Sequence, residues 1–330
     1  MKKAFIIVII GFTVYSIYSL VAQVDMESAE SMLVDMPSYW WVFLLFSITA
    51  NFLATWAWIL LDPSHQLKKV SFGELFFLRQ AGESIGQLNP TGAIGGDYLK
   101  YKVLTNKIEN NSIQKPLYLF RVYSIVSYFF VVLLVLLIYI IFYIEKPHWI
   151  QNALIVSLSL FLIYLFKIIK NIPKLILKIL VTIEKIFRIN FGFIDKFSSF
   201  SQGISSLKFT GSHLLPIFLL VLHWVVGSLE IFAITQILNV PLTALQAIIA
   251  DFGIMVFKTV GQVVPAQIGV EEVGNSFMLK IFGGFSAAAW IGLSLLRRLR
   301  QLFWITISLI YLMFHRKLFN KAVVSLKKNT

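Results

Sequence analysis

Cysteine is absent from the 330-residue sequence, and charged residues are scarce at 14%. Without cysteine the chain has no disulfide, no zinc–thiolate site and no thiol nucleophile. A soluble domain of this size carries roughly 25% charged residues, so a soluble globular fold is disfavoured. Apolar residues stand in place of the missing charge, because 58% of the chain is hydrophobic and the mean hydropathy is +0.80.

The apolar residues lie in continuous runs of roughly 20, the length that crosses a hydrocarbon core about 30 Å thick. These runs do not alternate with polar residues, so they predict helices rather than a barrel. We therefore expect an all-α polytopic membrane protein with about six full transmembrane helices and two broken, re-entrant hairpins in an inverted repeat. The expected spans are residues 4–22, 39–61, 116–143, 149–166, 214–238 and 287–314.

The expected organisation is a single transmembrane domain, 1–330, made of two halves. The first half covers about 1–145 and contains a broken segment, 72–101. The second covers about 212–315 and contains a broken segment, 244–282. Between the halves, residues 167–208 alternate apolar and lysine positions at helical spacing. This linker predicts a basic helix on the inner leaflet, or alternatively a solvated linker helix.

The net charge of +13 is concentrated between the apolar runs. Basic residues gather at Lys68 and Lys69, at Lys100, Lys102, Lys107 and Lys115, in 167–208, and in 316–328. Cytoplasmic loops carry such an excess, so we expect a protein of the cell inner (cytoplasmic) membrane with both termini cytoplasmic. The same pattern argues against a nucleic acid partner. The start of the chain predicts an uncleaved first helix rather than a signal peptide.

Two short motifs recur in the broken segments. Gly86–Pro90 and Gly261–Pro265 both read G-Q-x-x-P, while Ile94–Asp97 and Ile268–Glu271 both read I-G-x-D/E. The helix before the first copy is expected to end inside and the helix before the second to end outside, so the copies would be inverted. Interrupted hydrophobic segments at corresponding positions of an inverted repeat indicate the substrate site of a transporter.

Proline and glycine are expected to shape both hairpins, because proline cannot continue a helix and glycine allows a tight reversal. The residues expected to do so are Gly86, Pro90, Gly92, Gly95, Gly96, Gly261, Pro265 and Gly269. Asp97, Glu271 and Glu272 lie near the starts of the two return helices. They are either helix N-caps or first-turn acids that satisfy free N–H groups, or sites that bind a coupling proton or cation.

Charged side chains inside the apolar segments are candidates for function, since each is unfavourable at membrane depth. Arg79 and Glu83 lie four residues apart and are able to pair on one helix face. Lys258 takes the place of Glu83 in the second copy and has no obvious local acid. It is expected to pair with Glu83 across the repeat or to meet a lipid phosphate.

The last span adds Arg297 and Arg300 on one face, beside Gln301, and arginine binds phosphate with two parallel hydrogen bonds. His223 and Glu230 share a face of their helix and predict either a hydrogen-bonded pair or a proton path. The candidate headgroup-binding residues are Arg79, Lys258, Arg297, Arg300, Asn89, Gln87 and Gln262. The candidate coupling or half-helix acids are Glu83, Asp97, Glu271, Glu272 and Glu230.

Three stretches, Pro90–Asp97, Pro265–Glu272 and Leu295–Arg297, carry a family resemblance. In them the chain resembles the flippase-like integral membrane family that includes the transmembrane region of lysylphosphatidylglycerol synthases. The second stretch departs from that family at Ala266 and Gln267, where the family usually has small residues with glycine. The chain ends shortly after its last span, where those synthases carry an aminoacyl-transfer domain, so the resemblance implies lipid translocation and not aminoacyl transfer.

These observations favour a lipid flippase or secondary transporter that moves an anionic lipid or a lipid-linked headgroup between leaflets. A lipid-modifying enzyme is an alternative, but the sequence contains no H-E-x-x-H, G-x-S-x-G or P-loop motif. We therefore expect no enzymatic activity, no cofactor and no metal. A membrane accessory subunit of envelope glycolipid biosynthesis is the other alternative. Expected partners are membrane lipids and either a second copy of the chain or an envelope-biosynthesis protein.

Overall fold

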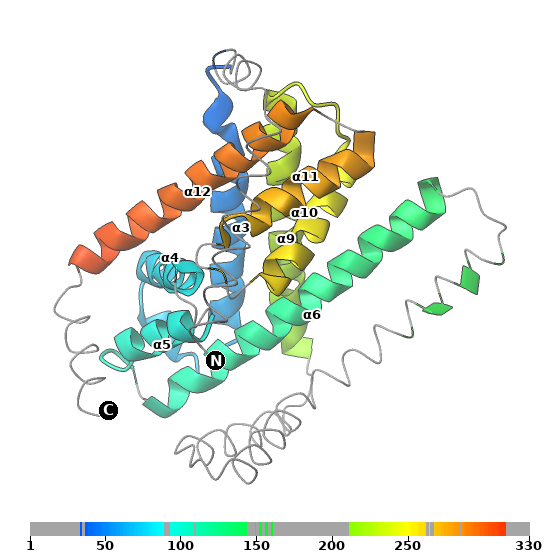
Figure 1. Cartoon of the computed structure of the whole chain (residues 1–330). Coiled ribbons are helices and arrows are strands. Elements are labelled where there is room, and N and C mark those ends of the chain that lie inside the picture. Colours follow the sequence, from blue (N-terminus) through cyan, green and yellow to red (C-terminus); the bar gives the residue numbers. More distant parts are fainter. Residues whose placement is uncertain are drawn as a thin grey trace, which may run out of the picture. The chain divides into compact units, whose positions relative to one another are not determined.

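The computed structural model of the chain describes residues 34, 37–88, 93–108, 110–143, 149, 152–153, 156–157, 160, 211–261, 264, 267–283 and 286–314. Eight α-helices form this described part, and it contains no β-strand (Figure 1). The predicted all-α class is therefore confirmed for these residues. The chain divides into two compact units, residues 1–120 with 222–330, and residues 121–221. Both broken segments belong to the first unit.

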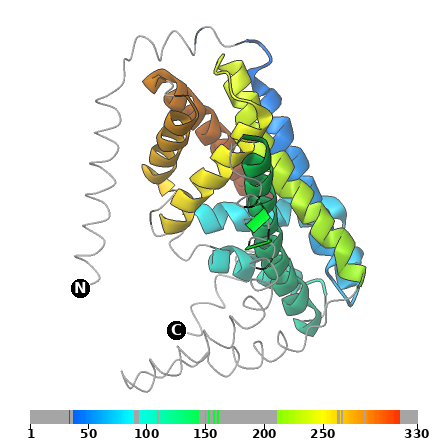
Figure 2. The same ribbon diagram turned by 90° about the vertical axis from the view of Figure 1, so that its right-hand side faces the viewer.

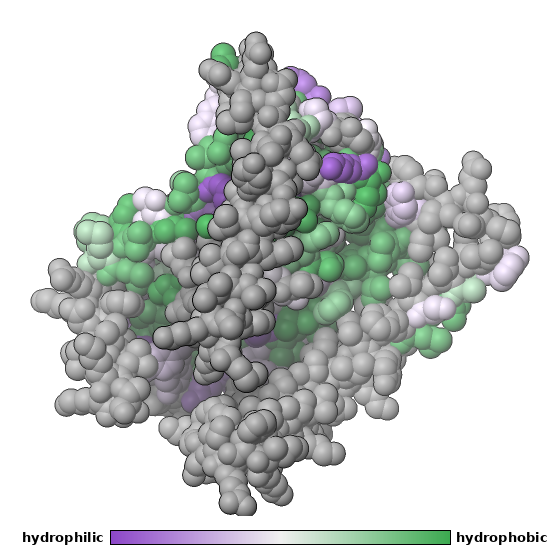
Figure 3. Space-filling model, in the orientation of Figure 1, coloured by the Kyte–Doolittle hydropathy of each residue, from purple (hydrophilic) through white to green (hydrophobic). Residues whose placement is uncertain are grey.

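Three described helices are long and apolar enough to cross a membrane: Trp40–Leu60, Ile113–Tyr139 and Gly211–Ile237. They correspond to α3 (Phe43–Leu60), α6 (Asn110–Tyr143) and α9 (Leu214–Ile237). Large apolar side chains are exposed on their surfaces, among them Phe52, Trp56, Ile141, Leu215 and Phe218. Apolar residues likewise dominate the coloured surface in Figure 3. The chain is a multi-pass membrane protein.

The expected spans 39–61, 116–143 and 214–238 are thus confirmed as helices of suitable length and composition. Span 4–22, most of span 149–166 and the amphipathic linker 167–208 lie outside the described residues.

The first broken segment forms a helical hairpin of α4 (Phe72–Leu88) and α5 (Ala93–Leu104). The two helices pack most closely where Gly82 meets Gly96, because a Cβ on Gly96 would collide with the carbonyl group of Gly82. Gly86, Gly95 and Gly96 were expected in the reversal, but they lie inside the helices. Gly96 lies in α5 against the backbone of Gly82, so its role is to permit close packing of the two helices.

The second broken segment forms the corresponding hairpin of α10 (Ala244–Val260) and α11 (Val270–Gly283). Thr243 and Gln246 cap α10 reciprocally, each side chain bonding the other residue's backbone N–H group. Gly261 ends α10 as its C-cap. Gly269 precedes α11 with φ of 83°, a left-handed conformation that favours glycine. Here the expectation that glycine shapes the reversal is confirmed.

The last helix, α12 (Ala287–Phe314), has the bounds expected from the sequence and packs against both hairpins, on α4 and on α11. Its Trp304 donates a hydrogen bond to Ser47 Oγ of α3 at 2.8 Å. The hydrophobic core of this unit lies where the start of α3, α9, α10, α11 and α12 meet. Its members include Phe43, Ile234, Ala250, Met278 and Leu293.

The helix order repeats: a long helix, a two-helix hairpin and a second long helix occur as α3 to α6 and again as α9 to α12. The leading helices run antiparallel, because Phe43 at the start of α3 shares one buried cluster with Ile237 at the end of α9, while Ala50 lies against Gly227. Figure 2 shows α3 and α9 side by side. An inverted repeat requires this relation of its two leading helices.

Candidate functional site

The first hairpin holds a lysine between two acids. Lys100 on α5 is 1% exposed, and its Nζ lies 3.0 Å from Glu83 on α4 and 3.0 Å from Asp97. Lys100 therefore closes the hairpin from inside, whereas the sequence placed it among the cytoplasmic loop lysines. Asp97 lies beyond the first turn of α5, so its expected role as a first-turn acid is wrong.

Arg79 ties the same hairpin to α3. Its Nε donates to Thr55 Oγ1 at 3.0 Å, and its Nη2 donates to the backbone and side-chain oxygens of Asn51. The side chain is buried. Arg79 thus faces α3, and Glu83, its expected partner on α4, faces Lys100.

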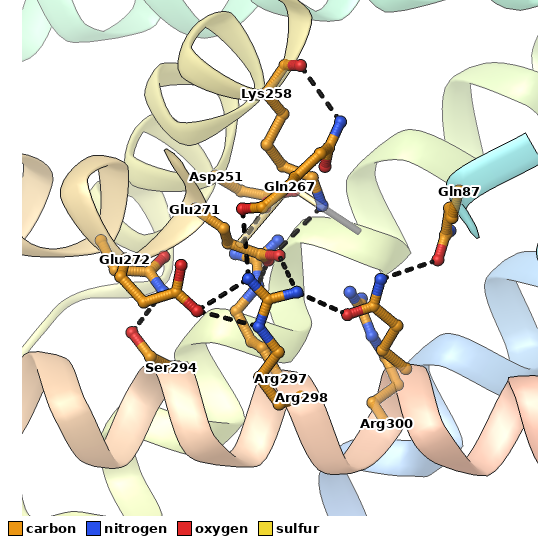
Figure 4. Close-up of polar contacts among 12 residues, drawn as sticks. Gln87, Asp251, Lys258, Gln267, Glu271, Glu272, Ser294, Arg297, Arg298 and Arg300 are labelled. Atoms are coloured by element: carbon orange, nitrogen blue, oxygen red, sulfur yellow. Dashed lines mark hydrogen bonds and ion pairs between the residues drawn. The ribbon is translucent and has the colours of Figure 1, made fainter. Parts of the chain in front are cut away.

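The larger polar site is a cluster of charges between α12 and the second hairpin, which we call the α12 charge cluster. It consists of Glu230, Asp251, Lys258, Glu271, Glu272, Arg297, Arg298 and Arg300. Four elements contribute: α9, α10, α11 and α12. Figure 4 shows the arginines of α12 directed toward the carboxylates and Lys258. Four cations face four carboxylates, so the cluster is formally neutral.

Arg297 lies at the buried centre of the cluster. Its Nη1 bonds Asp251 Oδ1 at 3.0 Å, and its Nε lies 2.9 Å from Glu271 Oε1. Glu271 also accepts from Lys258 Nζ at 3.4 Å. Lys258 therefore has a local acid on its own hairpin, and the expected pairing with Glu83 across the repeat is wrong.

Arg298 connects α12 to the start of α11. It bonds Glu272 Oε1 from Nε at 2.8 Å and the backbone oxygen of Gln267 from Nη2 at 3.2 Å. Glu272 in turn accepts the N–H of Gly269 at 2.8 Å. The expectation that Glu272 is a first-turn acid of the return helix is confirmed, and the same carboxylate also holds an arginine.

Arg300 pairs with α9. Its Nη1 lies 2.5 Å from Glu230 Oε2, and the carboxylate is 2% exposed while the arginine side chain is 22% exposed. His223, the expected partner of Glu230, instead bonds the backbone oxygen of Ala50 through Nδ1 at 2.8 Å. A carbonyl oxygen accepts only, so Nδ1 carries the proton.

A chain of amides joins the cluster to the first hairpin. Arg298 Nη1 donates to Gln301 Oε1 at 2.7 Å, and Gln301 Nε2 donates to Gln87 Oε1 at 3.1 Å. Gln87 belongs to the first G-Q-x-x-P motif. The polar face of α12 therefore contacts both members of the repeat (Figure 4).

Comparison with known families matches residues 4–308 to the lysylphosphatidylglycerol synthase TM region. The chain belongs to this family. The resemblance seen in the three stretches is confirmed, and membership ties the chain to membrane-lipid biosynthesis or translocation. Comparisons with curated proteins and with solved structures give no significant match.

The sequence patterns did not identify Lys100 and Asp251 as site residues. Both carried a usable signal, since Lys100 lies three residues after Asp97 and Asp251 lies seven residues before Lys258, on one helix face. Arg298 was left out of the candidate set because it does not share a face with Arg297 and Arg300. It is nevertheless the arginine that bonds Glu272 and Gln301.

Several candidate site residues lie outside the described residues. They are Asn89, Pro90, Gly92, Gln262 and Pro265. Their expected roles in turning the hairpins or binding a headgroup stay predictions.

Proposed function

We propose that the protein moves an anionic lipid, or a lipid-linked headgroup, from one leaflet to the other as a flippase or secondary transporter. The observation that carries this proposal is the α12 charge cluster, which places three arginines of one apolar helix beside the broken second hairpin. An isolated charge at membrane depth is unfavourable by about 2.5–3.5 kcal/mol or more, so eight such side chains in one cluster imply a use.

The chemistry of the cluster suits a phosphate. Arginine forks form two parallel hydrogen bonds with phosphate oxygens, and the carboxylates that hold them now occupy the same donors. A headgroup that enters replaces a carboxylate rather than filling an empty cationic pocket. The substrate-free cluster therefore remains neutral and tolerable in the membrane.

The arrangement of elements suits alternating access. One helix, α12, contacts α4 of the first hairpin and α11 of the second. In transporters with inverted repeats the substrate site lies at the interface of the repeats, and one repeat moves against the other. The proposed transporter has six membrane spans arranged as an inverted repeat. The headgroup moves along the polar face of α12, where the α12 charge cluster is formally neutral.

The basic clusters of the sequence support a location in the cytoplasmic (inner) membrane with both termini cytoplasmic. Membrane lipids are the proposed partners. A second copy of the chain or an envelope-biosynthesis protein is proposed as a further partner. Transport, rather than catalysis, is the activity proposed.

The test is lipid translocation in proteoliposomes. Fluorescent phosphatidylglycerol, phosphatidylethanolamine and phosphatidylcholine are placed in one leaflet, and their arrival in the other is followed by quenching with dithionite. We expect accelerated exchange of the anionic lipid and a loss of at least about tenfold in Arg300→Gln, which removes one phosphate-binding fork.

The matched control is Lys107→Gln. Lys107 pairs with Glu74 outside the α12 charge cluster, so its replacement should preserve the rate. No accelerated exchange of any lipid by the correctly folded protein would contradict the proposal.

A further inference from the structure

Glu230 is a buried carboxylate that uses only half of its hydrogen-bonding capacity. Its Oε2 accepts from Arg300, whereas its Oε1 is buried and has no hydrogen-bond partner among the described residues. A buried charged oxygen without a donor is unfavourable, and Arg300 is the one group among the described residues that hydrogen-bonds this carboxylate.

Arg300 depends on Glu230 in the same way. Within the part of the chain that the structure describes, Glu230 is its one carboxylate partner. Arg297 by contrast contacts both Asp251 and Glu271, and Arg298 contacts both Glu271 and Glu272. Displacement of one carboxylate therefore releases Arg300 and neither of the other two arginines.

The exposure of the pair identifies which partner a ligand reaches. The Arg300 side chain is 22% exposed and that of Glu230 is 2% exposed. A phosphate oxygen that approaches Arg300 competes with Glu230 for the same guanidinium. Once displaced, Glu230 remains in a nearly dry position on α9 without its hydrogen-bonded cation.

A carboxylate in that position becomes neutral by taking up a proton. The other charged groups that act on Glu230 are Arg297 of α12 and Asp251 of α10, and these two already bond each other. They leave Glu230 without a substitute for Arg300.

We infer that Glu230 and Arg300 form a proton-coupled phosphate site, in which a lipid phosphate replaces Glu230 on Arg300 and Glu230 takes up one proton from water. This inference rests on the proposed function and names its coupling ion. When the phosphate leaves, Arg300 returns to Glu230 and the proton is released.

Calorimetry of lipid binding tests the inference on the detergent-solubilised full-length protein. Dioctanoyl phosphatidylglycerol is titrated at neutral pH in two buffers that differ in ionisation enthalpy, and the difference in heat gives the number of protons taken up. We expect about one proton per lipid bound, and an affinity that rises up to about tenfold for each unit by which the pH falls.

Glu230→Gln should bind the lipid with no proton uptake and with an affinity that changes less than about twofold over the same pH range. Glu74→Gln, which alters an acid paired with Lys107 away from the cluster, should keep the wild-type response. Inorganic phosphate and dioctanoylglycerol are titrated in parallel. If inorganic phosphate binds as tightly as the lipid and with the same proton uptake, the ligand of this site is free phosphate and not a lipid.

The wild-type measurement decides the matter even when Glu230→Gln does not fold. Lipid binding without proton uptake would overturn the inference and leave the proposed function standing. The absence of lipid binding at every pH would overturn the proposed function, and the inference with it.

Discussion

At the scale of single residues, Glu271 shows why the charges of this protein are tolerated in an apolar environment. One of its oxygens lies 2.9 Å from Arg297 and 3.4 Å from Lys258, and the other lies 3.9 Å from Arg298. The side chain is 5% exposed. One carboxylate thus compensates cations from two helices, and its loss leaves each of them in a low-dielectric region with less compensation.

Glu271→Gln should therefore destabilise the protein strongly. Removal of one partner of a buried ion pair lowers the free energy of unfolding by about 3–5 kcal/mol. Thermal unfolding in detergent, followed by circular dichroism, measures the loss. Glu74→Gln breaks the partly exposed pair with Lys107 and is the matched control, expected to change the stability by no more than about 1 kcal/mol. Equal stability of the two variants would contradict a structural role for the cluster.

At the scale of secondary-structure elements, glycine determines how closely the two helices of a hairpin approach. Gly82 and Gly96 bring α4 and α5 together, and Gly274 brings α11 against Ile254 and Phe257 of α10. Small residues have this function in membrane helices, because helix association there depends on close van der Waals packing. In both hairpins a glycine of the return helix lies at the contact.

Gly96→Ala should force α4 and α5 apart. The added methyl group meets the backbone of Gly82, which is not able to rotate away, and overpacking of this kind destabilises by about 1–3 kcal/mol. Gly73→Ala is the control on the same hairpin, because nothing lies within 4 Å of its Cβ position. Alanine there should change stability by less than about 1 kcal/mol, in the stabilising direction. Thermal unfolding of both variants distinguishes packing from helix propensity.

At the scale of the whole described unit, α12 is the element that holds the repeat together. Toward the first hairpin it uses hydroxyl groups, with Ser84 and Ser308 2.9 Å apart. Toward the second it uses charge, through Arg297 and Arg298. Movement of the hairpins against each other requires at least one of these contacts to break.

The absence of cysteine makes this requirement testable by cross-linking. Ser84→Cys combined with Ser308→Cys should form a disulfide on oxidation, detected as a mobility shift that a reductant reverses. The bond should lower lipid exchange in proteoliposomes, with recovery on reduction. Gly73→Cys with Ser308→Cys is the control, since position 73 lies about 16 Å along α4 from position 84 and should not cross-link. Full exchange by the cross-linked protein would show that α4 and α12 do not separate during transport.

Composition and periodicity predicted the membrane class, the approximate bounds of the described spans and the two broken segments. These depend on local composition and on periodicity. The length of the last apolar run predicted both ends of α12, and glycine marked the second hairpin at Gly261 and Gly269. Gly269 with its left-handed φ is the clearest case, because a single backbone conformation demanded that residue type.

Which charges are partners followed only from the way the helices pack. Spacing predicted pairs within one helix, yet Arg79 bonds α3, His223 bonds α3, and Glu230 bonds α12. The physical reason is that buried charges require the nearest opposite charge in space, and helix packing brings together residues up to 257 positions apart in the sequence, as in Ser47 and Trp304. The opposite signs of Glu83 and Lys258 at matched positions were visible in the sequence, whereas their separate partners, Lys100 and Glu271, followed from how each hairpin folds on itself.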